Sequence, residues 1–260
     1  MRLDLALVRC GLVPSRERAK AAILAGEVST NGLVRCKPGH EVSEDDAISL
    51  LKEHSYVGRG YLKLQKALEV FSIAISGQIC MDIGASTGGF TQLLLQRGAQ
   101  KVFAIDVGTG QLADILKADP RVVNLEKTDF RTLKKEQIDL CGFACADVSF
   151  ISLKLILPHL FSLLEETGQA VCLVKPQFET GKSVKHGIVK DAKTQIRVLE
   201  EICDAARLSG FACRGLTHSP ITGGEGNIEF LLHLARGEKS PDAAIDIQQA
   251  VRLAWEELKS

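Results

Sequence analysis

Short apolar runs of β type alternate with amphipathic stretches over most of this 260-residue chain, and this alternation restricts its possible folds more than any other feature. The amphipathic stretches have the 3.6-residue period of a helix. We expect strands at 79–83, 102–105, 122–125, 143–148 and 170–174. We expect helices near 90–97, 112–117, 153–164 and 192–208. The alternation predicts an α/β fold with a mostly parallel sheet that has helices on both faces.

The two ends of this α/β region have a different pattern. A helix is expected over 62–71, before the first strand. Two late strands, at 211–218 and 227–234, come with no helix between them, so we expect them to pair antiparallel at one edge of the sheet. A final helix is expected at 241–258. The sheet is thus expected to contain seven strands.

The first 52 residues indicate a separate, small α+β unit. A short helix is expected to end at Gly11, and a second one to begin after Ser15, a residue type that caps helix N-termini. Asn31-Gly32 between β-type residues predicts a hairpin, and a short strand is expected at 48–51. Residues 53–61 contain two glycines and have little periodicity, as is typical of a linker. The predicted domains are therefore 1–52 and 62–260.

Charge is distributed unevenly along the chain, although its 32 basic and 32 acidic side chains balance. Residues 1–40 contain seven basic and three acidic residues, so their net charge is +4 and that of the remainder is −4. Arg16 and Lys20 lie four residues apart and share one face of the second expected helix. An ordinary solvated helix face is an equally good interpretation of these two alone. The candidates for contacts with RNA phosphates are Arg2, Arg16, Arg18, Lys20, Arg35 and Lys37.

Cysteine usage and hydropathy restrict the setting in which the chain works. None of the eight cysteines forms a C-x-x-C pair, and several lie inside apolar runs, so we expect reduced core thiols and no metal site. The longest apolar stretch, at 153–164, is interrupted by Lys154, Pro158 and His159 and falls short of the roughly 20 residues that span a bilayer. No signal peptide is recognisable, so the protein is predicted to be cytoplasmic and not inserted in a membrane.

A glycine-rich turn at 84–89 follows the first expected strand and precedes a helix. Ligands of open α/β sheets bind at the carboxyl ends of the strands, so a cofactor is expected here. A dinucleotide needs G-x-G-x-x-G for its pyrophosphate, but Ser86 stands where the second glycine belongs. A carboxylate at Asp82 would repel a pyrophosphate and attract the ammonium or sulfonium of S-adenosylmethionine. The turn residues expected to contact the cofactor are Gly84, Ser86, Gly88 and Gly89.

Two further carboxylates follow the next two expected strands. Asp106 is placed to accept hydrogen bonds from both hydroxyls of a cofactor ribose, and Asp129 is placed to reach an adenine amino group. Either acid can instead cap a helix, an interpretation that suits Asp129 about as well as binding does. A glycine-rich turn with carboxylates at successive strand ends favours S-adenosylmethionine over a nicotinamide dinucleotide.

At this point the sequence resembles a known family. Four segments, Asp-Ile-Gly-Ala-Ser-Thr-Gly-Gly-Phe, Ala-Asp147-Val-Ser-Phe-Ile-Ser, Leu-Val-Lys175-Pro-Gln-Phe-Glu and Gly-Asn-Ile-Glu229-Phe-Leu-Leu, resemble the TlyA family of ribosomal RNA 2′-O-methyltransferases, which are also called hemolysins. The catalytic domain of that family is similar to FtsJ, a Rossmann-like class I methyltransferase fold. The first 40 residues resemble the RNA-binding domain named after ribosomal protein S-four. The resemblance implies a domain of each kind in this chain, and ribosomal RNA or ribosomal subunits as partners.

The resemblance also implies a Lys-Asp-Lys-Glu catalytic set, which falls on Lys63, Asp147, Lys175 and Glu229. Asp147 is also expected to contact the cofactor. Transfer of a methyl group to a ribose hydroxyl, with a cytidine as the expected target nucleotide, needs a base because the hydroxyl is a poor nucleophile. Lys175 is the hypothetical base, since partial burial and a second ammonium, that of Lys63, favour its neutral form. Asp147 is expected to orient Lys175, and Glu229 to pair with Lys63.

Three alternatives remain open at this stage. A nicotinamide-dependent dehydrogenase is disfavoured by Ser86. A membrane-active hemolysin is suggested only by the family's second name. An RNA-binding protein with an inactive methyltransferase fold is disfavoured because all four catalytic positions are filled. The sequence lacks Asn-Pro-Pro-Tyr near Asp147 and a Pro-Cys nucleophile, which disfavours methylation of an exocyclic amine or of cytosine carbon 5. It specifies neither the oligomeric state nor the ribosomal subunit that is modified.

Overall fold

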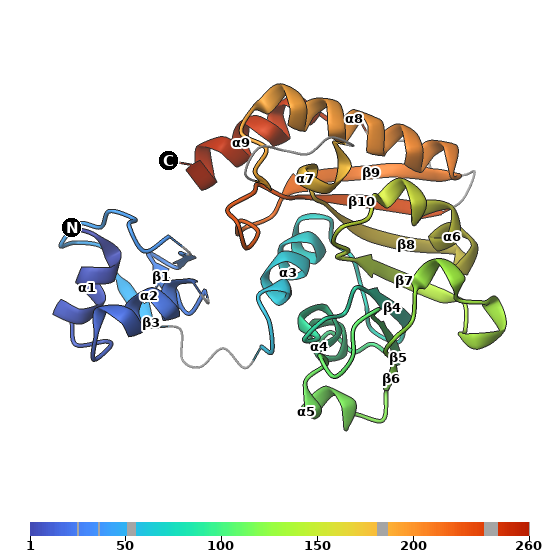
Figure 1. The fold of residues 1–260 in the computed structure, drawn as a ribbon, viewed down its shortest axis with the longest axis horizontal. Helices are drawn as coiled ribbons and strands as arrows, with labels where there is room; N and C mark the ends of the chain where they lie inside the picture. Colours follow the sequence, from blue (N-terminus) through green and yellow to red (C-terminus); the bar gives the residue numbers. More distant parts are fainter. Residues whose placement is uncertain (25, 36, 51–55, 181–186, 237–243, 260) are drawn as a thin grey trace. The chain divides into compact units, whose positions relative to one another are not determined.

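A computed structural model describes residues 1–24, 26–35, 37–50, 56–180, 187–236 and 244–259. The described chain forms two compact units, Met1–Arg59 and Gly60–Ser260 (Figure 1). The domain limits expected from the sequence, 1–52 and 62–260 with a linker at 53–61, stay a prediction, because residues 51–55 lie outside the described part. Each unit has a hydrophobic core of its own.

The N-terminal unit packs two helices, α1 (Leu3–Arg9) and α2 (Arg16–Leu24), on a small antiparallel sheet in the order β2-β1-β3. The strands are β1 (Val28–Thr30), β2 (Leu33–Val34) and β3 (Ile48–Leu50). Two local predictions are confirmed. The backbone N–H of Arg18 donates to Ser15 Oγ at 3.2 Å, so Ser15 caps α2. Asn31 and Gly32 have φ of 51° and 78°, the left-handed pair that a two-residue hairpin turn requires.

The C-terminal unit contains one seven-stranded sheet in the order β6-β5-β4-β7-β8-β10-β9. Strands β6, β5, β4, β7 and β8 are parallel, and β10 pairs antiparallel with both β8 and β9. The predicted fold class and the antiparallel edge are therefore confirmed. The strands are β4 (Ile79–Ile83), β5 (Lys101–Ile105), β6 (Val122–Leu125), β7 (Cys141–Ala146), β8 (Leu164–Val174), β9 (Phe211–His218) and β10 (Phe230–Arg236).

Helices cover both faces of this sheet (Figure 1). The helices α8 and α9 pack against each other and against β9, whereas α3 and α4 pack against each other, α3 also against β10 and α4 also against β4 and β5. The helices are α3 (Gly60–Val70), α4 (Gly89–Gln96), α5 (Asp114–Lys117), α6 (Leu157–Leu163), α7 (Pro176–Glu179), α8 (Ala192–Leu208) and α9 (Ile247–Lys259). Three 3₁₀ turns, η1 (Phe130–Thr132), η2 (Lys135–Gln137) and η3 (Leu153–Leu155), complete the unit.

Several boundaries differ from the sequence-based expectation. The helix expected over 153–164 is divided into η3 and α6, and Pro158 lies in the first turn of α6, where its missing N–H costs no hydrogen bond. Strand β8 begins at Leu164 and not at residue 170. Strand β7 ends at Ala146, so Asp147 lies in the loop after it. Strand β10 begins at Phe230, one residue after Glu229. The first residues of the expected final helix, 241–243, lie outside the described residues, and α9 begins at Ile247.

The described cysteines are free thiols, and six of them are buried, as expected for a reduced core. Among the described residues, no helix combines the length and the apolar composition needed to cross a bilayer.

Candidate active site

The order of the strands directs one group of loops to the same edge of the sheet. Strand β4 lies between β5 and β7, and all three run parallel, so the chain leaves β4 toward one side and later returns on the other. Ligands of open α/β sheets bind at such a switch point, outside the carboxyl ends of the strands. Gly84, Asp106, Asp147 and Lys175 each directly follow the last residue of a strand, β4, β5, β7 and β8 respectively. The expected site residues are therefore collected at this edge.

The turn between β4 and α4 is shaped by the protein around it. Gly84 and Gly88 have φ of 83° and 95°, and a Cβ at Gly84 would collide with the backbone carbonyl oxygen of Asp147. A Cβ at Gly88 would collide with the side chains of Leu112 and Leu116. Both glycines were expected from the sequence to contact the cofactor. The structure shows that both are needed first for the backbone conformation and for packing against neighbouring segments.

Asp82 lies inside β4, as the strand expected at 79–83 implies, but its side chain does not face the open site. It is the fourth residue of β4, and its side chain is fully buried. One carboxylate oxygen accepts from the Thr91 backbone N–H at 2.9 Å and from the Thr91 hydroxyl at 2.7 Å. The Cys145 thiol lies 3.8 Å from the other oxygen. Burial raises the pKa of this carboxyl to about 7. Asp82 thus fixes the first turn of α4 to the sheet, and direct contact with a cofactor stays a prediction that this buried position does not favour.

The side chain of Asp106, which follows β5, is hydrogen-bonded to the glycine-rich turn. Its two carboxylate oxygens accept from the backbone N–H groups of Ser86 at 2.8 Å and Gly108 at 2.7 Å. A carboxylate has about four acceptor positions, so two remain for a ligand. Asp129 instead caps η1, where it accepts from the Arg131 backbone N–H at 3.0 Å and pairs with the Arg131 guanidinium at 2.6 Å. These bonds lower the pKa of Asp129. The capping interpretation therefore describes Asp129 in this structure.

The four residues of the expected Lys-Asp-Lys-Glu set form one connected cluster. Lys63 Nζ on α3 lies 2.7 Å from a carboxylate oxygen of Glu229 and 3.7 Å from Oδ2 of Asp147. Lys175 Nζ lies 2.6 Å from Oδ1 of Asp147. The contact between Lys175 and Asp147 is an ion pair without hydrogen-bond geometry, because Oδ1 of Asp147 accepts no hydrogen bond. Asp147 therefore links the two lysines, and Glu229 closes the cluster on the side of Lys63.

Burial makes this cluster unusual. Lys63 and Lys175 are each 8% exposed and Glu229 is 2% exposed. Removing an ion from water costs on the order of several kcal/mol, so buried charges persist only when they are paired. Two ammonium groups and two carboxylates balance each other here, which allows the cluster to remain charged away from bulk water. Such a site can hold or move a proton without a net charge of its own.

Sequence reasoning missed two polar contacts beside the cluster. Lys175 Nζ donates to Ser149 Oγ at 2.9 Å. The buried carboxylate of Glu179 accepts from the Ser152 hydroxyl at 2.5 Å and from the Leu153 backbone N–H at 2.8 Å. The second pair of bonds ties the loop after β7 to α7, which directly follows Lys175. Both contacts join residues that are 26 or 27 positions apart in the sequence, so no local sequence pattern predicts them.

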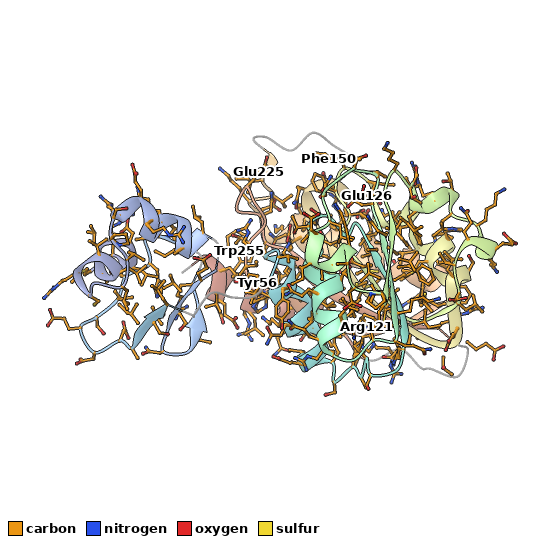
Figure 2. All side chains as sticks on the ribbon, turned by 90° about the horizontal axis from the view of Figure 1, so that it is seen from below. Tyr56, Arg121, Glu126, Phe150, Glu225 and Trp255 are labelled. Carbon is orange, nitrogen blue, oxygen red and sulfur yellow. The ribbon has the colours of Figure 1, made fainter. Side chains whose placement is uncertain are left out.

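An exposed aromatic pair lies on the same loop. Phe150 is 91% exposed and has a φ of 62°, a left-handed conformation that bulky residues seldom adopt. Its ring packs against Phe178, with 4.8 Å between the ring centres. Figure 2 shows Phe150 at the surface of the C-terminal unit. Strained backbone at an exposed apolar ring is typical of functional loops and not of the core.

The basic residues of the N-terminal unit fall into two groups. Arg2 and Arg16 donate to the fully buried carboxylate of Asp4 at 3.0 and 2.9 Å, and both guanidinium groups remain about half exposed. Arg35 donates to the Thr30 hydroxyl at 2.6 Å. The side chains in the second group are exposed and have no ion pair among those found in the described chain: Arg18, Lys20 and Lys37. Contact with RNA stays a prediction for all six.

Residues 56–236 match the family model described as FtsJ-like methyltransferase, and residues 1–48 match that of the S4 domain. The chain is 45% identical to the Bacillus subtilis protein YqxC, which is named as an rRNA methyltransferase, over 99% of this chain and 95% of the relative. It is 42% identical to the Mycobacterium tuberculosis 16S/23S rRNA (cytidine-2′-O)-methyltransferase TlyA, over 98% of this chain and 97% of the relative.

A solved structure from Streptococcus thermophilus, titled as a hemolysin, superposes with a TM-score of 0.78 at 44% identity. The superposition covers 100% of this chain and 97% of the other. Both names expected from the sequence therefore occur among the relatives. The chain belongs to the FtsJ-like methyltransferase family, in the group that includes the TlyA proteins, and its methyltransferase domain is preceded by an S4 domain.

Proposed function

We propose that this protein transfers a methyl group from S-adenosylmethionine to a ribose 2′-hydroxyl of ribosomal RNA, with Lys175 as the base. The observation that supports this most strongly is the buried, charge-balanced cluster of Lys63, Asp147, Lys175 and Glu229 at the carboxyl edge of the sheet. The name of the Mycobacterium tuberculosis relative, which is matched over 97% of its length, describes 2′-O-methylation of cytidine in rRNA, so we propose a cytidine as the target nucleotide. A cytoplasmic location, where ribosomal subunits are available, is part of the proposal.

The residues of the turn fit S-adenosylmethionine better than a dinucleotide. Asp106 retains free acceptor positions beside the turn, which suits the two hydroxyls of a ribose. The turn at 84–89 contains no basic side chain to balance a pyrophosphate, and the carboxylate of Asp106 borders it. An acidic border attracts the cationic amino acid part of S-adenosylmethionine. When bound, this cofactor supplies a methyl group that its sulfonium has already activated.

The chemistry left to the protein is to orient the ribose hydroxyl and to take its proton. Lys63 contacts two carboxylates, those of Asp147 and Glu229. Lys175 contacts one carboxylate, which it shares with Lys63, and one hydroxyl. Lys175, the lysine beside the exposed Ser149, is therefore assigned as the base, which must act as a neutral amine. In that form its Nζ accepts the proton of the ribose hydroxyl as the oxygen receives the methyl group.

The substrate is proposed to be RNA for two reasons beyond the family. The S4 domain presents exposed basic side chains, which suit phosphates. The exposed ring of Phe150, one residue after Ser149, suits stacking with an unpaired base. Nothing in the described residues favours membrane insertion as a second function, since no helix among them is suited to cross a bilayer.

The proposed function is tested by incubating the protein with unmodified ribosomal subunits and S-adenosylmethionine labelled in the methyl group. We expect label in the RNA, at a position that resists alkaline cleavage because its 2′-oxygen is blocked. Label that remains alkali-sensitive would show base methylation instead. Titration with S-adenosylhomocysteine and, separately, with NADH checks the cofactor, and binding of NADH alone would contradict the assignment.

A further inference from the structure

The hydroxyl of Ser149 contacts the proposed base from a position that the Lys-Asp-Lys-Glu set does not include. Lys175 Nζ donates to Ser149 Oγ at 2.9 Å and forms an ion pair with Asp147 Oδ1 at 2.6 Å. Lys175 is 8% exposed, whereas Ser149 is exposed. Ser149 therefore lies on the side of the ammonium that faces solvent, which is the side from which a substrate must arrive.

A base on a flexible stem needs more than one contact to be oriented. A lysine side chain carries its nitrogen on four carbons, and the nitrogen rotates freely about the last bond. The ion pair with Asp147 fixes the distance of Nζ but not its direction, and Asp147 is also shared with Lys63. The hydrogen bond to Ser149 supplies the second contact. The ion pair limits where Nζ can lie and the hydrogen bond to Ser149 limits how Nζ is turned, so the two contacts together restrict the direction in which the amine faces a substrate.

The loop that carries Ser149 is itself anchored to the segment that carries Lys175. Glu179, in the short helix after Lys175, accepts from Ser152 Oγ at 2.5 Å and from the Leu153 backbone N–H at 2.8 Å. The segments that carry Lys175 and Ser149 are therefore fixed to each other by hydrogen bonds. Because its own position is fixed in this way, Ser149 can restrict the position of the Lys175 amine.

We propose that Ser149 is a positioning residue for methyl transfer, and that its hydroxyl directs the Lys175 amine toward the ribose hydroxyl. The proposal rests on the proposed role of Lys175 as base. It assigns Ser149 no covalent step and no contact with the transferred methyl group. Its consequence is a loss of turnover without a loss of binding when the hydroxyl is removed, because only the direction of the base changes.

The test compares Ser149→Ala with Ser149→Thr in the full-length protein, using unmodified ribosomal subunits and labelled S-adenosylmethionine. For Ser149→Ala we expect kcat to fall about 10-fold, less than the roughly 100-fold that a displacement of about 1 Å costs. The KM for the subunits and the Kd for S-adenosylhomocysteine should change less than about twofold. Ser149→Thr keeps a hydroxyl and should restore most of kcat. Ser162→Ala, which removes a hydroxyl bonded to His159 outside the site, is the matched control.

Three results would overturn the proposal. The first is a Ser149→Ala variant with unchanged kcat and KM. The second is a raised KM with unchanged kcat, which would indicate an RNA contact, and the third is an equal loss of kcat in the alanine and threonine variants, which would indicate loop packing. Lys175→Ala, measured in parallel, separates this failure from that of the proposed function. If Lys175→Ala retains the wild-type rate, the role of Lys175 itself is wrong. If only Ser149→Ala retains it, the base stands and the positioning role fails.

Discussion

Each unit of this protein contains an aspartate that contacts two cations, but the two clusters distribute burial in opposite ways. In the N-terminal unit Asp4 is fully buried, and Arg2 and Arg16 reach it from the surface. In the C-terminal unit Lys63 and Lys175 are buried, and Asp147 between them is partly exposed. The first cluster leaves its positive charge where an external phosphate can meet it. The second offers its positive charge only to a group that enters the site.

The two clusters also differ in the type of cation, which is arginine in the N-terminal unit and lysine in the C-terminal unit. Arginine keeps its charge at all relevant pH values and presents a rigid set of donors, whereas lysine can give up its proton. The hydrogen bond from Arg2, which outweighs the effect of burial, lowers the pKa of Asp4 to about 2, with a further contribution from Arg16. A permanent cation on a buried carboxylate stabilises a fold and binds anions. A lysine that shares its carboxylate with another lysine is suited to acid–base chemistry.

The largest effect is expected from exchanging the cation type in the active site. Lys175→Arg retains positive charge beside Asp147 but cannot accept a proton. We expect kcat to fall by about 10²- to 10⁴-fold, the contribution of a positioned base. Methylation of unmodified subunits measures it, and Lys154→Arg, at an exposed ion pair with Glu201, is the control. A Lys175→Arg variant that keeps half of the rate would mean that Lys175 acts only through its positive charge, as the arginines of the N-terminal unit do. The two clusters would then not differ in acid–base chemistry.

Removing the charge of the buried acid in the N-terminal unit should affect stability. Asp4→Asn leaves two guanidinium groups facing a neutral amide, and we expect a loss of about 1–3 kcal/mol in the free energy of local unfolding. Hydrogen exchange of residues 3–24 measures this loss in the full-length protein. Below the ordinary pKa of 3.8 the wild-type advantage should diminish as pH falls toward about 2, because Asp4 itself becomes protonated. Glu44→Gln, at an exposed ion pair with Arg9, should leave exchange unchanged.

A third aspartate sharpens the comparison, because Asp82 is as buried as Asp4 but contacts no cation among its hydrogen-bond partners. Its pKa is raised from 3.8 to about 7, so the folded state holds a proton that the unfolded chain releases. Stability should therefore fall as pH rises from about 4 to about 7 and then level off. Asp82→Asn should lack this fall and gain at least about 1.4 kcal/mol relative to wild type across that window, the value of one pKa unit.

Urea unfolding at pH 4.5, 6 and 8 measures the effect at Asp82, with Asp139→Asn as an exposed control. A difference between Asp82→Asn and wild type that stays constant with pH would mean that Asp82 is charged throughout. In that case burial without a cation would not distinguish Asp82 from Asp4.

Asp82 also shows where sequence reasoning stops. A motif identifies an acid near a strand end, but its direction depends on its place in the strand. Asp106 and Asp147 directly follow β5 and β7 and lie at the open edge, whereas Asp82 is still inside β4, where side chains alternate between covered faces. The alternation of strands and helices predicted the sheet, because each element follows from local periodicity. The position of β10 between β8 and β9 depends on pairing between distant segments, which no local pattern contains.

The candidate site was predictable to the same extent. The Lys-Asp-Lys-Glu set was found by its motifs, and the structure brings its four members together. The bonds from Ser149 to Lys175 and from Ser152 to Glu179 were not found, because serines and glutamates are common and these pairs meet only through the fold. Residues that chemistry singles out are visible in a sequence, whereas residues that hold them in position are visible only in three dimensions.

The smallest effect is expected from the exchange opposite to that in the active site. Arg16→Lys keeps a cation within reach of Asp4 at the exposed end of this pair, so stability should change by less than about 1 kcal/mol. If Arg16 contacts an RNA phosphate, Arg16→Lys should also preserve the salt dependence of RNA binding, whereas Arg16→Ala should reduce the slope of log affinity against log salt by about 1. An unchanged slope in Arg16→Ala would mean that the Arg16 guanidinium contacts Asp4 and no RNA phosphate. The arginine cluster would then be as closed to external ligands as a buried one, and exposure alone would not separate the two clusters.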